Sequence, residues 1–117
     1  MKRRIAVAAL SLSAAGLVSI ANLEGFSEKA YIPIPGDVPT IGFGSTEGVR
    51  MGDTITVPKA LERLMRDVGV EESAIGRCVK VPLSQSEYDA FTSFALNAGG
   101  EAFCSSTLVK KLNAGDY

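Results

Sequence analysis

Carboxylates are the side chains that must carry any acid–base chemistry in this sequence. The 117 residues contain no histidine, which excludes Ser-His-Asp and Cys-His hydrolysis and the usual zinc sites. Glu24 is the first acidic residue of the chain, and Asp37 is the only acidic residue between Tyr31 and Thr40. We expect no metal and no cofactor.

Cys78 and Cys104 are the two cysteines of the chain. Two cysteines are too few for a metal site. If the protein is exported, the oxidising compartment outside the cytoplasm would join them in a disulfide. That bridge would stabilise the fold by roughly 3 to 4 kcal/mol on the chain-entropy model. Two buried free thiols are the alternative.

The charge distribution excludes binding to nucleic acid. Lys2, Arg3 and Arg4 all precede Glu24, and the remainder of the chain carries more acidic than basic residues. Binding to phosphates requires clustered Lys and Arg, which the sequence lacks. With 46% hydrophobic and 21% charged residues, the chain is expected to form one small globular domain and to be monomeric.

The N-terminus has the pattern of a membrane-directed segment. Three basic residues precede the run from Ile5 to Leu23, which is uncharged and about as long as a helix that crosses the hydrocarbon core. The positive-inside rule places the rest of the chain outside the cytoplasm. Alanine, serine and glycine dilute the apolar residues of the run, so its hold on a bilayer should be weak.

Three interpretations of this segment remain open. A cleaved signal peptide fits the small residues of Ser19-Ile20-Ala21. A permanent anchor is the second interpretation, and a signal-anchor that inserts and later leaves the membrane is the third. We therefore divide the chain into a signal-anchor segment at residues 1–23 and a domain at residues 24–117.

The region after the segment is expected to form short strands. Prolines and glycines between Tyr31 and Val57 exclude a helix there. We predict a hairpin that pairs Ala30–Ile34 with Thr40–Phe43, and a weak third strand at Thr54–Val57. Gly42 and Gly44 are expected to let the backbone approach another group closely.

Three helices are predicted to follow. The first begins at Pro58, and its core face is formed by residues at helical spacing, namely Leu61, Leu64, Met65 and Val68. Ser84 and Glu87 predict a capping box for the second, which ends at the glycines after Asn97. The third is expected to start near Ser105 and to end at Gly115. Asp116 would suit the cap of a further helix, so the sequence looks C-terminally incomplete.

Several blocks of this sequence, in order, resemble phage-type lysozymes of glycoside hydrolase family 24. The blocks are Glu24-Gly25-Phe26, Lys29-Ala30-Tyr31, Gly36 to Gly44, Val81 to Gln85, Phe94 to Gly99, Ser106-Thr107-Leu108 and Asn113 to Asp116. The apolar, small-residue segment before Glu24 resembles that of signal-anchor-release endolysins from lambdoid and related phages. The resemblance implies an α+β, lysozyme-like fold with a small β-hairpin lobe and a helical lobe, preceded by an N-terminal apolar helix.

The sequence departs from the family pattern at the second carboxylate. That pattern has a Glu, an Asp or Cys nine residues later, and a Thr six residues beyond. Pro33 stands nine residues after Glu24, and Thr40 comes one residue later than usual. Asp37 is therefore the candidate for the second carboxylate, presented from a re-shaped turn.

The resemblance implies a role for each candidate residue. Glycosidic cleavage takes one protonated acid and one ionised carboxylate. Glu24 suits the acid, since its apolar neighbours Leu23 and Phe26 would exclude water. Asp37 would orient or activate water. The resemblance also implies that Thr40 positions that water and that Asn97 contacts a sugar.

Each of these residues also has a structural interpretation. Glu24 could mark the membrane boundary, and Asp37 is a good turn residue in Pro-Gly-Asp. Thr40 could be an ordinary strand residue, and Asn97 could cap its helix. Ser45, where many relatives have His, is expected to be a turn residue.

The expected function is that of an endolysin. The chain would hydrolyse the β-1,4 bond between N-acetylmuramic acid and N-acetylglucosamine in peptidoglycan during host lysis. Residues 5–23 would hold it in the inner membrane, facing the periplasm, before its release there. The alternatives are a truncated, inactive prophage remnant and a membrane-tethered module that binds peptidoglycan without cleaving it.

Overall fold

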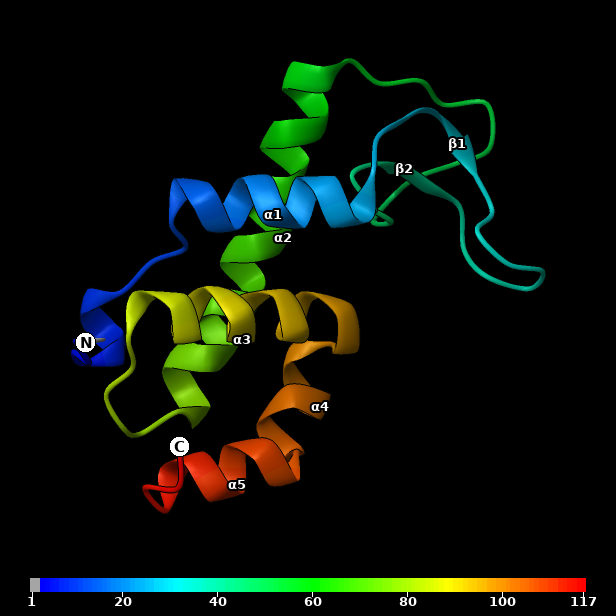
Figure 1. The fold of residues 1–117 in the computed structure, drawn as a ribbon. Coiled ribbons are helices and arrows are strands. Elements are labelled where there is room, and N and C mark those ends of the chain that lie inside the picture. Colours follow the sequence, from blue (N-terminus) through cyan, green and yellow to red (C-terminus); the bar gives the residue numbers. More distant parts are fainter. Residues whose placement is uncertain (1–2) are drawn as a thin grey trace. The chain divides into compact units, whose positions relative to one another are not determined.

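A computed structural model describes residues 3–117 and has the expected α+β fold (Figure 1). Met1 and Lys2 of the basic N-terminus lie outside the described residues. The elements are a short 3-10 helix η1 (Val7–Ala9), α1 (Ala14–Glu24), β1 (Ser27–Tyr31), β2 (Thr40–Gly42), α2 (Val57–Cys78), α3 (Gln85–Ala98), α4 (Gly100–Ser105) and α5 (Thr107–Asn113).

The chain forms two compact units. The hairpin unit comprises Ser19–Asp67, and the helical unit comprises the residues up to Val18 together with Val68–Tyr117. α1 and α2 each contribute residues to both units.

In the hairpin unit, β1 and β2 pair antiparallel, with Ser27 opposite Gly42 and Tyr31 opposite Thr40. The predicted first strand, Ala30–Ile34, was placed too late in the chain. Pro33 and Pro35 lack the N–H that a strand pairing needs, and Ile32 and Ile34 are exposed. These residues form the loop that follows β1.

The predicted third strand is reduced to a single bridge. Lys29 pairs with Thr54, and the Ile55 N–H donates to the Glu28 carbonyl at 2.9 Å. A small apolar core beneath the hairpin contains Ala30, Ile41 and Val49.

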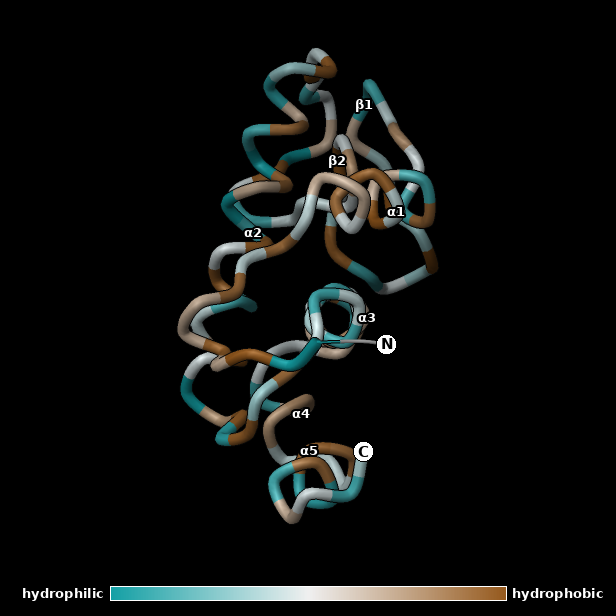
Figure 2. Tube along the Cα trace, turned by 60° about the vertical axis from the view of Figure 1, so that its left-hand side comes forward, coloured by the Kyte–Doolittle hydropathy of each residue, from teal (hydrophilic) through white to brown (hydrophobic). Residues whose placement is uncertain are grey.

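The apolar face predicted for α2 is only partly buried. Leu64 and Val68 are fully buried, whereas Leu61 and Met65 are 37% and 51% exposed. Figure 2 shows hydrophobic and hydrophilic positions alternating along this helix. Helical spacing identified the stripe but not its width, because the neighbouring elements cover only part of it.

The helical unit has the larger core. Phe103 of α4 is fully buried, and its ring lies 6.0 Å from that of Phe91 and 5.7 Å from that of Phe94. Cys78 at the end of α2 and Cys104 in α4 form a disulfide across a sequence separation of 26. Closing a loop of this length contributes about 3.5 kcal/mol on the chain-entropy model, a large share for a small domain.

The caps predicted for the later helices are confirmed. Ser84 and Glu87 form the capping box of α3. Gly115, with a φ of 86°, ends α5 because its N–H donates to the Leu112 carbonyl. The third predicted helix, expected to start near Ser105, is α5, which Ser106 caps; the short helix α4, which ends at Ser105, was not predicted.

The single apolar helix expected before Glu24 is not found. α1 starts only at Ala14, and the residues before it form η1 and extended backbone. Ile5 pairs with Leu83 through two backbone hydrogen bonds of 2.8 and 2.9 Å. Among residues 3–117, no helix is both long enough and apolar enough to cross a membrane.

Carboxylates of the helical unit explain where α1 begins. Glu72 accepts the Leu12 N–H at 2.8 Å. Asp89 accepts the Ser13 N–H at 3.0 Å and also the Ser13 hydroxyl, while the Ser13 Oγ accepts the Gly16 N–H at 2.9 Å. These acceptors satisfy the N–H groups that a helix leaves unpaired at its N-terminus, so the helix starts here.

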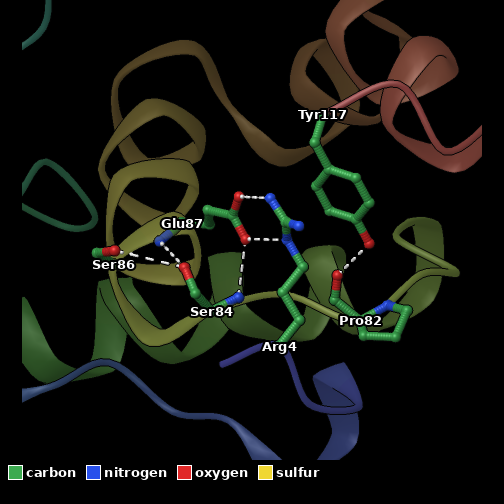
Figure 3. Close-up of polar contacts among 6 residues, drawn as sticks. All are labelled: Arg4, Pro82, Ser84, Ser86, Glu87 and Tyr117. Atoms are coloured by element: carbon green, nitrogen blue, oxygen red, sulfur yellow. Dashed lines mark hydrogen bonds and ion pairs between the residues drawn. The ribbon is translucent and has the colours of Figure 1, made fainter. Parts of the chain in front are cut away.

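Arg4 fastens the start of the described chain to α3 (Figure 3). Its guanidinium donates to both carboxylate oxygens of Glu87, at 3.0 and 2.8 Å, and lies 3.7 Å from the centre of the Tyr117 ring. The Tyr117 hydroxyl donates to the Pro82 carbonyl. The hydrogen bond from Arg4, together with those from Ser84, lowers the pKa of Glu87 to about 2.

This ion pair predicts a specific pH dependence of stability. Because the pKa of Glu87 falls from 4.5 to about 2 on folding, its contribution is complete above the ordinary value and disappears as the pH falls through the folded value. We expect Glu87→Gln to lower the Tm at pH 6, and the difference from the unmodified chain to vanish near pH 2. Thermal unfolding followed by circular dichroism at both pH values measures it, and a constant difference would contradict the assignment.

Candidate active site

Glu24 is the last residue of α1 and is half-buried. The helix ends there because Gly25 adopts a φ of 70°, which glycine reaches without strain, while its N–H still donates to the Ala21 carbonyl at 3.0 Å. The side chain of Glu24 lies against Gly44: a Cβ built on Gly44 would stand 2.8 Å from the carboxylate oxygen Oε2. No side chain fits between the two residues.

Gly42, Phe43 and Gly44 form a tight turn, here called the glycine turn. Ile41 and Ser45 close it by donating backbone N–H groups to each other's carbonyls, at 2.9 and 3.0 Å. A Cβ on Gly42 would meet the Ala60 Cβ of α2 at 2.9 Å. The close backbone approach predicted for both glycines is therefore confirmed.

The strand register brings Glu24 to this turn. Ser27 lies opposite Gly42, so the residues just before Ser27 and just after Gly42 occupy the same end of the hairpin. Figure 1 shows the end of α1 at this end, and the loop between β1 and β2 extending away from it. Two segments that are distant in sequence thus form the surroundings of one carboxylate.

Two phenylalanines belong to the segments that meet here. Phe26 follows Glu24 by two residues and is 41% exposed, and its ring centre lies 5.4 Å from that of Phe43 in the glycine turn. Leu23, which we expected to exclude water from Glu24, is 77% exposed and does not do so. The group that lies against the Glu24 carboxylate is the glycine turn.

Thr40 lies at the start of β2 and is buried. Its hydroxyl donates to the Val38 carbonyl at 3.2 Å. Since the hydrogen is used in this way, the oxygen can only accept a further hydrogen bond.

Asp37 lies in the loop between the strands and is exposed. Its N–H donates to the Ile34 carbonyl at 3.0 Å across Pro35 and Gly36, as in a Pro-Gly turn. Its carboxylate accepts the Val38 N–H at 2.8 Å. The residue thus has the turn role that its sequence context predicts, and among residues 3–117 no hydrogen bond joins it to Glu24.

The structure therefore brings together only part of the predicted site. Glu24 meets the glycine turn, and Thr40 lies on the strand that leads into that turn. Asn97 is exposed near the end of α3 in the helical unit, and its contact with a sugar stays a prediction. In the described part of the chain, no group of three or more His, Cys, Asp or Glu could hold a metal ion.

Ser45 closes the glycine turn, in agreement with its expected role as a turn residue. The sequence did not show that it is also buried, at 1% exposed, or that its hydroxyl donates to Asp67 of α2 at 2.7 Å. Asp67 was not a candidate, because it reads as one more charged residue on an amphipathic helix.

The arrangement supports proton transfer by one carboxylate. Glu24 is placed by the end of a helix and by a backbone turn, and it is half-exposed. A carboxyl group held in this way can donate a proton to a leaving group.

Comparisons with known proteins identify the family. The family model described as Phage lysozyme matches residues 21–117. An endolysin of Acyrthosiphon pisum secondary endosymbiont phage 1 is 42% identical, over 92% of this chain and 73% of its own length. A SAR-endolysin of Pseudomonas phage phiKMV is 38% identical, over 98% of this chain and 69% of its own length.

A solved structure gives the same result for the fold. The endolysin from Escherichia coli O157:H7 phage FAHEc1 superposes with a TM-score of 0.83 at 38% sequence identity, covering 92% of this chain and 70% of that one. The residues that the family model matches include Glu24, the glycine turn and the helices that follow. The chain belongs to the phage lysozyme family.

Proposed function

We propose that Glu24 is the general acid with which this chain cleaves glycan strands. The observation that carries the proposal is the contact between the Glu24 carboxylate and Gly44, which fixes one carboxylate at the end of the hairpin. As a member of the phage lysozyme family, the chain is a muramidase that hydrolyses peptidoglycan in host cell lysis. Its substrate is the β-1,4 bond between N-acetylmuramic acid and N-acetylglucosamine.

The mechanism then needs one proton and one water molecule. Glu24 gives its proton to the glycosidic oxygen as the bond to the anomeric carbon breaks. Thr40, whose oxygen can only accept, holds one hydrogen of the attacking water. Asp37 is the second carboxylate and accepts the other proton of that water as the water oxygen bonds to the anomeric carbon.

Replacement of Glu24 tests the acid. Glu24→Gln keeps the shape of the side chain but cannot donate the proton, so we expect turnover of purified peptidoglycan to fall at least about a hundredfold. Reducing ends released per minute measure it, with the Tm recorded to show that the variant is folded.

Two further variants make the result specific. Glu28→Gln removes an exposed carboxylate of β1 and should leave turnover unchanged, whereas Asp37→Asn should lower it. If Glu24→Gln still turns over substrate, Glu24 is not the acid. If the unmodified, folded chain binds peptidoglycan without cleaving it, a binding module is the better description.

Gly44 offers a second test. Gly44→Ala would place a methyl group 2.8 Å from the Glu24 Oε2 and would strain a backbone with a φ of 91°, so we expect turnover to fall at least about tenfold. Gly48→Ala is the matched control, because Gly48 has a φ of 69° with no atom near its Cβ position. The control keeps the strain without the contact. Equal turnover in the two variants would show that the contact is unimportant.

We also propose that residues 5–23 hold the chain at the inner membrane before its release into the periplasm. The segment has no charge between Ile5 and Leu23, and a relative that matches nearly the whole chain is named a SAR-endolysin. After release the segment takes the packed conformation described above, in which α1 carries Glu24.

Two exposed positions allow the membrane step to be tested without disturbing the fold. Ala15 and Ser19 are exposed on α1, so changing both to leucine strengthens insertion but leaves the packed state intact. We expect the double variant to stay in the membrane fraction of expressing cells, and a matched double glutamine variant to be soluble. Identical fractionation of the two variants would refute the membrane proposal.

A further inference from the structure

The hydrogen bond between Ser45 and Asp67 is a buried contact of the hairpin unit that the mechanism does not use. Ser45 is 1% exposed, and its hydroxyl donates to a carboxylate oxygen of Asp67 at 2.7 Å. A buried hydroxyl without a partner is destabilising, and a hydrogen bond to a carboxylate is stronger than one to a neutral acceptor. Asp67 therefore holds Ser45 firmly to α2.

Ser45 is also one of the two residues that close the glycine turn. Its N–H and carbonyl both pair with Ile41, and its neighbour Gly44 lies against the Glu24 carboxylate. A chain of direct contacts thus runs from Asp67 through Ser45 and Gly44 to Glu24.

The other side of the turn is attached differently. Gly42 belongs to β2, opposite Ser27 of β1, and its backbone lies close to α2, because an added Cβ would stand 2.9 Å from the Ala60 Cβ. The hydrogen bond to Asp67 joins the Ser45 side of the turn to α2 by a directional polar contact.

We propose that Asp67 is a positioning residue, which sets the place of the Glu24 carboxylate by holding Ser45 and the glycine turn against α2. The inference rests on the proposed role of Glu24 as the acid. It assigns to Asp67 an effect on the chemical step beyond its effect on stability, because a displacement of about 1 Å at a reacting group can lower a rate by up to about a hundredfold.

The test compares Asp67→Leu and Ser45→Ala with Asp67→Asn, whose amide oxygen can accept the same hydrogen bond. In the full chain, we expect the first two to lower kcat about tenfold with KM changed less than about twofold, and Asp67→Asn to keep at least about half of kcat. Val109→Ala, in the core of the helical unit, is the control for a general loss of stability, with all rates compared at equal distance below each Tm.

A second measurement does not depend on turnover. The side-chain carboxyl carbon of Glu24, observed by NMR, should shift in Asp67→Leu and Ser45→Ala but not in Asp67→Asn or Val109→Ala. If that resonance is unmoved and kcat follows the Tm in every variant, Asp67 is merely structural. If the resonance shifts as expected but Glu24→Gln retains turnover, the positioning is right and the proposed acid is wrong.

Discussion

The carboxylate of Glu24 and the backbone of Gly44 are so close that one methyl group cannot stand between them. Several features of the hairpin unit are needed for this contact between Glu24 and Gly44. α1 must end at Glu24, which the left-handed Gly25 permits. The strands must pair in the register that sets Ser27 opposite Gly42. The approach places a backbone turn directly against this carboxylate.

The helical unit depends on a different requirement. The backbone N–H groups at the start of α1 need hydrogen-bond acceptors, and the uncharged segment around them contains no carboxylate. The residues before α1 pack on α3 and on the end of α2, with Ile5 paired to Leu83 and Arg4 bound to Glu87. Burial and the nearby carboxylates of Glu72 and Asp89 raise the pKa of Tyr88 to about 12.

Local patterns in the sequence were sufficient to predict much of this fold. The capping box of α3, the glycine that ends α5 and the close approach at Gly42 and Gly44 each depend on residue types within a few positions of one another, so they could be predicted. The α+β class and the candidate acid came from ordered blocks resembling a known family. Three features could not be predicted: the start of α1, the hydrogen-bond partner of Ser45 and the ion pair of Arg4. Each joins residues far apart in sequence through charged side chains whose partners no local pattern identifies. The first strand of the hairpin was predicted too late in the chain, because the β-branched residues around Pro33 suggested a strand there. The prolines prevent strand pairing at these positions.

The caps of α1 have a consequence for how this chain can vary. An uncharged segment from Ile5 to Leu23 cannot contain its own acidic cap, so the acceptors come from Glu72 and Asp89, 60 and 76 residues from their donors. One part of the chain is therefore an uncharged peptide, and a distant part carries the carboxylates that accept its N–H groups. A chimaera that replaced residues 13 and 16 by unrelated ones would lose the fit at Ser13 and Gly16. The two parts are expected to be inherited together, although they are far apart in the sequence.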